Sequence, residues 1–197
     1  MTVPQGFVLS GDPVTAARSL LGAILRHGEV AVRVTEVEAY GGGGDAASHT
    51  FRGPTARNAT MFGPPGHLYV YLSYGIHWNA NVSCAAVGIG AGVLLRAGEV
   101  VEGIGVARSR RGHSTDRDLA RGPGRLCQAL AISKERDGDD VISGTAPVRL
   151  CPPPTVIAAE SVSTGPRVGV SREAERPWRF WLAGDRYVSA YKRSPRA

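Results

Sequence analysis

Hydrophobic and polar positions along the chain predict several short strands, and the clearest of these lies at residues 30–40. This segment, VAVRVTEVEAY, is rich in β-branched residues and is bounded by a glycine-containing turn and by a run of glycines. Because side chains alternate faces along a strand, Glu36, Glu38 and Tyr40 are expected to share one face. Neighbours two residues apart on that face lie about 7 Å from each other.

Elsewhere the pattern predicts short helices and further strands. Asp12 followed by Pro13 is typical of a helix N-cap and first helical residue, and Gly22 is typical of a helix end. Strands are expected at 23–26, on both sides of Gly75 within 67–83, and at 92–97, 167–170 and 178–182, and further helices at 99–111 and from Gly122 to Ile132. Residues 41–66 begin with four glycines and predict either a binding loop or a disordered insertion.

Two groups of side chains suggest nucleoside chemistry, although each has a purely structural alternative. A ring at Tyr40 could stack on a base while the carboxylate of Glu38 reaches the sugar carbon that holds it, but most strand carboxylates are only solvated. Tyr69 and Tyr71 share one face of the expected hairpin and form either a packed sheet face or a base platform. Tyr74, beside the turn, is on the other face and is expected to protrude.

Length and charge narrow the class of protein. A chain of 197 residues with no linker is expected to form a single domain, 1–197. Its net charge is +6, and 21 of its 23 basic residues are arginine, whose guanidinium groups suit phosphate oxygens and base stacking. Arg121 and Arg125 flank Gly122-Pro-Gly124 at an expected helix start, where phosphate could bind, although such basic runs are often merely solvated.

Other classes of protein find little support in the sequence. The cysteines Cys84, Cys127 and Cys151 are odd in number and contain no Cys-x-x-Cys pair, and the histidines have no familiar ligand spacing, so no metal site is expected. No apolar run approaches 18 residues. We therefore expect no membrane association and a cytoplasmic location, associated with the nucleoid if the source is prokaryotic.

A series of short blocks, in a consistent order and spacing, resembles the alkyladenine (3-methyladenine) DNA glycosylase family from about residue 14 to about residue 190. The blocks are Val34-Thr-Glu-Val-Glu-Ala-Tyr40, Asp45-Ala-Ala-Ser-His49, Met61-Phe62, Leu68-Tyr-Val-Tyr-Leu-Ser-Tyr-Gly75, Asn81, Leu94-Leu-Arg96 and Gly122-Pro-Gly-Arg-Leu-Cys-Gln-Ala-Leu-Ala131. The glycines at 41–44 are more numerous than in the family's usual pattern, which bears on loop rigidity and lesion preference.

The resemblance implies an α+β domain with a curved, largely antiparallel sheet, flanking short helices and a protruding hairpin that intercalates into DNA. It also implies a monofunctional, monomeric base-excision repair enzyme that uses no cofactor and acts on double-stranded DNA containing alkylated or deaminated purines. The resemblance implies that Glu38 is the general base and that Arg96 and the Val168 carbonyl hold the water. It implies that Tyr74 intercalates into DNA. The residues that it implies for the base pocket are Tyr40, His49, Tyr71, Asn81 and Leu94. Glu36 matches no catalytic position, so its removal is expected to cost far less than removal of Glu38.

Three alternatives stay open at this point. A bifunctional glycosylase/lyase needs an amine nucleophile, which only Lys134, Lys192 and the N-terminus offer, and neither lysine lies in a matched block. A lesion-binding module without turnover would not need Glu38 beside Tyr40. A small-molecule transferase on a related fold would leave Tyr74 and the arginine bias unexplained.

Overall fold

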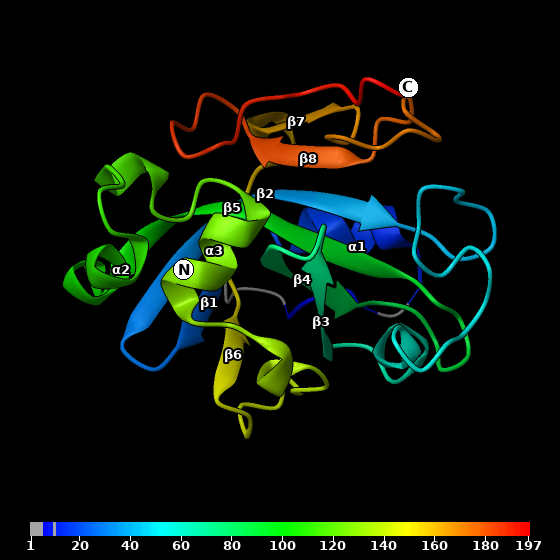
Figure 1. Cartoon of the computed structure of the whole chain (residues 1–197), viewed down its shortest axis with the longest axis horizontal. Helices are drawn as coiled ribbons and strands as arrows, with labels where there is room; N and C mark the ends of the chain where they lie inside the picture. Colours follow the sequence, from blue (N-terminus) through cyan, green and yellow to red (C-terminus); the bar gives the residue numbers. More distant parts are fainter. Residues whose placement is uncertain (1–5, 10) are drawn as a thin grey trace.

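The two longest strands, β2 (Val30–Tyr40) and β5 (Gly92–Glu102), pair at the centre of a curved antiparallel sheet (Figure 1). In this computed structural model, which describes residues 6–9 and 11–197, the strand order is β3-β4-β5-β2-β1-β6. β8 pairs with the second half of β2, and β7 pairs with β8. The architecture is therefore α+β with a curled antiparallel sheet, as expected. The remaining strands are β1 (Ile24–His27), β3 (Leu68–Ser73), β4 (His77–Ser83), β6 (Val148–Cys151), β7 (Val162–Gly165) and β8 (Arg179–Leu182).

Three short α-helices flank the sheet within the described residues: α1 (Pro13–Ser19), α2 (Ile104–Arg111) and α3 (Pro123–Leu130). α1 begins as expected, because the Asp12 side chain accepts a hydrogen bond from the Thr15 amide and Pro13 opens the helix. Single turns of 3-10 helix lie at Ala59–Phe62, Asp116–Asp118, Lys134–Arg136 and Ala159–Ser161. No helix in the described part of the chain is long and apolar enough to cross a membrane.

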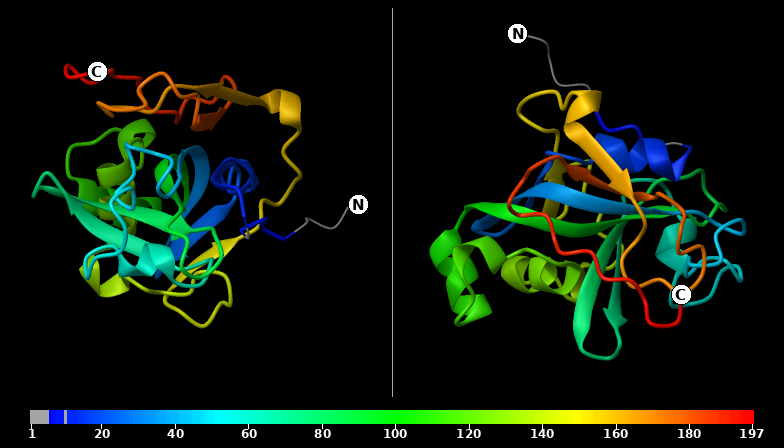
Figure 2. Two further views of the ribbon diagram at one scale, coloured as in Figure 1. Left: turned by 90° about the vertical axis from the view of Figure 1, so that its right-hand side faces the viewer. Right: turned by 90° about the horizontal axis from the view of Figure 1, so that it is seen from above.

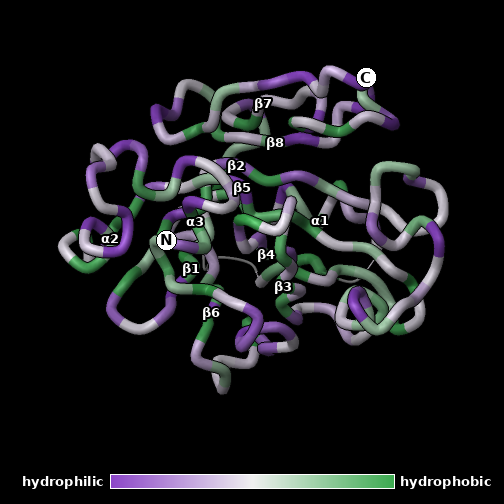
Figure 3. The backbone as a smooth tube through the Cα atoms, viewed as in Figure 1, coloured by the Kyte–Doolittle hydropathy of each residue, from purple (hydrophilic) through white to green (hydrophobic). Residues whose placement is uncertain are grey.

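Apolar side chains from the central strands and the helices form one buried core. Val32, Val34 and Val37 of β2 are fully buried, together with Leu95 of β5 and Leu126 of α3. Figure 3 shows that hydrophilic stretches are prominent in the peripheral loops and in α2. Burial of apolar surface stabilises the folded chain by about 25 cal/mol per Å² and is the main stabilising term for such a core, into which β2 and β5 are packed.

Two elements differ from the sequence prediction. The segment at 99–102 is strand rather than helix, because β5 continues to Glu102 in register with β2 and α2 begins only at Ile104. Gly98 allows this pairing, since a Cβ there would lie 2.4 Å from the Arg33 carbonyl oxygen. Residues 167–170 form a turn rather than a strand, and strand β7 precedes them.

The hairpin of β3 and β4 projects from the body of the protein, with its tip clear of the sheet (Figure 2). At the turn, Tyr74 has a φ of 51° and Gly75 a φ of 69°. Both lie in the left-handed region, which glycine adopts freely and tyrosine adopts at a cost. The Tyr74 side chain is 92% exposed, as its expected position beside the turn requires.

Candidate active site

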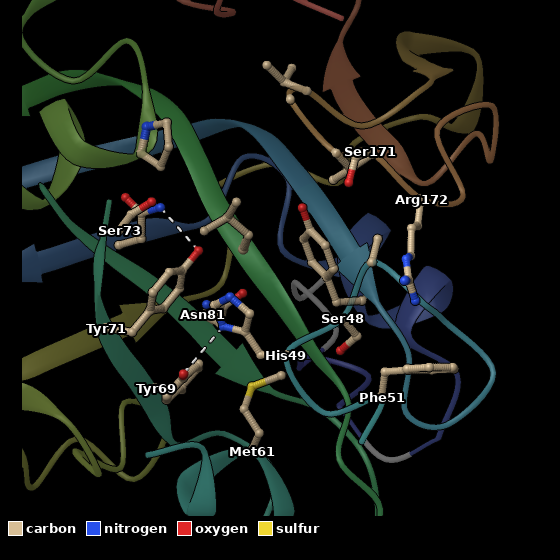
Figure 4. Close-up of a pocket in the computed structure, with 18 of the residues that line it drawn as sticks. Ser48, His49, Phe51, Met61, Tyr69, Tyr71, Ser73, Asn81, Ser171 and Arg172 are labelled. Carbon is tan, nitrogen blue, oxygen red and sulfur yellow. Dashed lines mark hydrogen bonds between the residues drawn. The ribbon is translucent and has the colours of Figure 1, made fainter. Parts of the chain in front are cut away.

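A cavity of about 710 Å³ opens between the β3–β4 hairpin, the loop that follows β2, and the turn at 168–172. In Figure 4, Ser171 and Arg172 lie across this cavity from Tyr71 and Asn81, while Ser48 and Phe51 come from the loop. Loop 41–66 therefore forms part of the cavity wall, and its buried residues Thr50 and Asn58 bind neighbouring backbone. Of the residues predicted for catalysis, the base pocket or intercalation, those lining it are Tyr40, His49, Tyr71, Tyr74, Asn81, Leu94, Arg96 and Val168.

Glu38 is fully buried and contacts three residues that line the cavity, namely Tyr40, Arg96 and Val168. One carboxylate oxygen accepts a hydrogen bond from the Tyr40 hydroxyl at 2.8 Å. The other accepts one from the Val168 amide at 2.7 Å and lies 3.3 Å from Arg96 Nη1. A carboxylate offers about four lone-pair positions, so these donors leave room for one more, such as a water molecule.

Glu36 is not a solvated neighbour of Glu38 but the centre of a buried ionic cluster. Its carboxylate accepts hydrogen bonds from the Ser189 amide at 2.6 Å, from the Ser189 hydroxyl at 3.0 Å and from Arg96 Nε at 3.0 Å. Arg179 Nε lies 3.4 Å from the same carboxylate. The reading of Glu36 as a solvated strand carboxylate is therefore wrong, and its removal should destabilise the fold because it leaves a buried arginine without its carboxylate. That loss of Glu36 slows excision far less than loss of Glu38 stays a prediction.

Arg96 connects the two carboxylates. Its buried guanidinium contacts both Glu36 and Glu38 and also faces the cavity. Burial alone would lower the pKa of Arg96, but the charges of Glu38 and Glu36 outweigh this and raise it. A fixed cation therefore lies between the two carboxylates at the cavity wall.

Aromatic rings from the loop and from β3 line one side of the cavity. The His49 ring meets the Tyr71 ring edge-on, with centroids 4.5 Å apart, and Tyr71 stacks on Tyr69 at 5.3 Å. Asn79 donates a hydrogen bond to the Tyr71 hydroxyl at 3.2 Å, which fixes the ring. Burial, with a smaller contribution from the charge of Arg57, lowers the pKa of His49, so its imidazole is neutral at pH 7.

Tyr40 faces the cavity from the end of β2, supported from behind by Arg167. The Arg167 guanidinium lies 4.6 Å from the centroid of the Tyr40 ring. Burial, followed by the charge of Glu38, raises the pKa of Tyr40 well above its usual value, so the hydroxyl is protonated and donates to Glu38.

Asn81 and Leu94 occupy the floor, where β4 pairs with β5. They are direct partners in the strand register, and Leu94 is also the partner of Glu38 on the other side of β5. The fold thus places the predicted general base and two predicted pocket residues in adjacent positions of three neighbouring strands.

The two arginines predicted for phosphate do not line the cavity. Arg121 donates through Nε to the Val188 carbonyl, and both Arg121 and Arg125 contact the carboxylate of Asp118. Pro123, the first residue of α3, does line the cavity. Arg125 is the more exposed of the two arginines and the more available to a ligand.

Sequence reasoning missed the groups that hold the site together, namely Asp45, Arg167, Arg179 and Ser189. Asp45 and Arg167 form a bidentate ion pair with both side chains fully buried. The sequence offered one signal for this pair, namely Arg167, a charged residue next to Val168 in a segment expected to be a strand. No cluster of three or more His, Cys, Asp or Glu residues in the described chain could hold a metal ion.

The chain is similar to known proteins along most of its length. A family model described as methylpurine-DNA glycosylase matches residues 7–186. A protein of Nocardia farcinica, named "Putative 3-methyladenine DNA glycosylase", is 56% identical over 94% of this chain and 90% of its own. Proteins with the same name from Frankia casuarinae and Mycolicibacterium fortuitum are 51% and 53% identical, covering 98% and 94% of this chain and 95% and 96% of their own.

Proposed function

The chain belongs to the methylpurine-DNA glycosylase family and is a hydrolytic DNA glycosylase, and we propose that it excises alkylated and deaminated purines from double-stranded DNA by the action of Glu38 on a water molecule. The substrates would be purines such as 3-methyladenine, 7-methylguanine, hypoxanthine and ethenoadenine. The observation that carries the proposal is the buried Glu38 carboxylate, held by Tyr40, Arg96 and Val168, three residues that line a cavity large enough for a base.

The cavity supports a mechanism in which the damaged nucleotide leaves the helix. An enzyme that acts on a base must take it out of the stack, at a cost of a few kcal/mol, and hold it between flat side chains. Tyr40, His49 and Tyr71 are proposed to hold the base, and Tyr74 at the exposed hairpin tip is proposed to fill the gap that it leaves.

Cleavage of the glycosidic bond passes through an oxocarbenium-like state at the sugar carbon. Glu38 is proposed to stabilise this charge and to remove the proton of the attacking water. Arg96, which reaches Glu38 and faces the cavity, is proposed to hold the water and a nearby phosphate. For Val168 the structure has the amide donating to Glu38, and the proposal retains its carbonyl as a ligand of the water.

Bases alkylated at N3 or N7 already carry positive charge and leave readily. A neutral base such as hypoxanthine or ethenoadenine instead needs a proton or hydrogen-bond donor at N7 before it can leave. The backbone amides of Ala47 and Ser48 donate to Asp45. The His49 amide has no protein acceptor within the described chain, and we propose that it is the donor to the bound base.

The test is excision from duplexes that contain 3-methyladenine, hypoxanthine or ethenoadenine, each compared with undamaged DNA. Treatment with alkali then cleaves the strand at each abasic site, and the cleaved strand is the product measured. Product from any damaged duplex and none from undamaged DNA supports the proposal. Binding without product would identify a lesion-binding module. Borohydride trapping on abasic DNA should give no adduct, because neither Lys134 nor Lys192 lines the cavity; the N-terminal amine lies outside the described residues.

A further inference from the structure

Asp45 and Arg167 form a buried ion pair for which the proposed chemistry has no use. Arg167 Nη1 and Nη2 lie 2.6 and 2.8 Å from the two Asp45 oxygens, across 122 positions of sequence. Buried ion pairs are often no more stabilising than apolar residues of the same size, because both charges must leave water. Stability alone therefore gives little reason for this pair.

The remaining bonds of the pair all reach backbone that carries site residues. Arg167 Nη1 also donates to the carbonyl of Ala39, which lies between Glu38 and Tyr40. The Asp45 carboxylate accepts from the amide of Gly41, directly after Tyr40, and from the amide of Ala47, which lines the cavity two residues before His49.

The guanidinium also sets the position of the Tyr40 ring. It lies 4.6 Å from the centroid of that ring and 5.5 Å from that of Trp178. Trp178 in turn accepts a hydrogen bond from the Ala39 amide through its carbonyl. The ring of Tyr40 is thereby backed by a fixed cation, and its hydroxyl is directed at Glu38.

Val168, the residue that follows Arg167, connects the ion pair to Glu38 directly. The Val168 amide donates to Glu38 at 2.7 Å, so any shift of Arg167 shifts a direct ligand of that carboxylate. Burial alone would raise the pKa of Asp45, but the hydrogen bonds and the charge of Arg167 outweigh this and keep that pKa below its usual value, so the pair is ionised at neutral pH.

We propose that Asp45 and Arg167 act as a clamp, a pair of positioning residues that fixes the Tyr40 ring and the Val168 amide against Glu38 and is required for excision rather than for DNA binding. The inference rests on the proposed function, since it takes Glu38 as the group that acts on the water. Neither residue touches the base, and both act through Tyr40 and Val168.

The experiment compares Asp45→Asn, Arg167→Lys and the double variant Asp45→Asn/Arg167→Lys with the wild-type protein. Asparagine keeps the shape of Asp45 without its charge, and lysine keeps the charge of Arg167 without its fork. Arg26→Lys and Glu102→Gln are the controls, because this pair has the same bidentate geometry on the outer surface and does not line the cavity. Each variant is measured for single-turnover excision of hypoxanthine, affinity for the same duplex, and thermal unfolding.

Both single clamp variants should excise about 10–100-fold more slowly, because displacement of a reacting group by about 1 Å is enough for such a loss. Affinity for the lesion duplex should stay near the wild-type value. The double variant should be no slower than the slower single variant, since the residues act as one unit. The controls should excise as the wild type does.

Excision at the wild-type rate by folded Asp45→Asn overturns the proposal, and so do additive losses or parallel losses of rate and affinity. If Arg167→Lys does not fold, Asp45→Asn decides alone, and failure of both to fold would make the pair a requirement for folding instead. A wild-type protein that does not excise hypoxanthine or any other damaged purine refutes the proposed function, whereas an active wild type with an equally active Asp45→Asn refutes only the clamp.

Discussion

Replacement of Glu36 by glutamine tests how the second carboxylate supports the site. The Glu36 side chain is fully buried and accepts hydrogen bonds from the Ser189 amide, the Ser189 hydroxyl and Arg96. Glutamine keeps one acceptor oxygen but places an NH₂ group where the other oxygen received a donor. Arg96 and Arg179 also lose the charge that compensates their burial.

Removal of one partner from a buried ion pair costs about 3–5 kcal/mol. The total stability of a protein of this kind is about 5–15 kcal/mol, so Glu36→Gln should fold but with much of its stability lost. With a slope of about 2 kcal/mol per M, the midpoint of unfolding should fall by about 1.5–2.5 M urea. Tryptophan fluorescence suits the measurement, because Trp181 is the strand partner of Glu36.

Glu102→Gln is the control, since Glu102 lies at the surface in an exposed ion pair with Arg26 and should unfold near the wild-type midpoint. A Glu36→Gln midpoint that moves no further than that of Glu102→Gln would refute the reasoning that Glu36 is the centre of the buried cluster.

Further predictions concern DNA. Tyr74→Ala should leave stability nearly unchanged, because the side chain is 92% exposed. It should weaken affinity for lesion duplex by about 5–150-fold, the equivalent of about 1–3 kcal/mol of stacking. Equal losses of activity on duplex and single-stranded substrates would contradict intercalation and show that Tyr74 contacts the extruded base instead. Asn81→Ser should raise excision of guanine-type bases relative to hypoxanthine by about tenfold, because the shorter side chain makes room for a 2-amino group, and an unchanged ratio would count against this. Arg125→Gln should reduce the salt dependence of binding to undamaged duplex by about 0.9 in slope, whereas a normal slope with altered lesion preference would assign Arg125 to the pocket.

The sequence was sufficient to predict the parts of the fold that depend on local pattern. The β-branched run at Val30–Tyr40, the Asp12-Pro13 helix start and the turn at Gly75 all have local physical causes, and the structure confirms them. The segment at 99–102 was mispredicted because its strand depends on β2, more than 60 positions earlier in the sequence. Pairing with β2 overrides the local preference.

The candidate site was also predictable only where it depends on local pattern. The alternation of strand residues correctly puts Glu36, Glu38 and Tyr40 on one side, with Glu38 bound to Tyr40. Period two does not say whether a charged face meets solvent or protein, so the burial of Glu36 was missed. Its partner Ser189 lies 153 positions away, and no local pattern joins the two.

The central claim is that Glu38 removes the proton of the water that attacks the sugar carbon of the damaged nucleotide. Its most direct test is single-turnover excision of hypoxanthine from duplex DNA by Glu38→Gln, with affinity for the same duplex measured alongside. Glutamine keeps the shape of the side chain but cannot take a proton from water, so the account predicts wild-type binding with excision reduced to background. Excision by Glu38→Gln at the wild-type rate would contradict it.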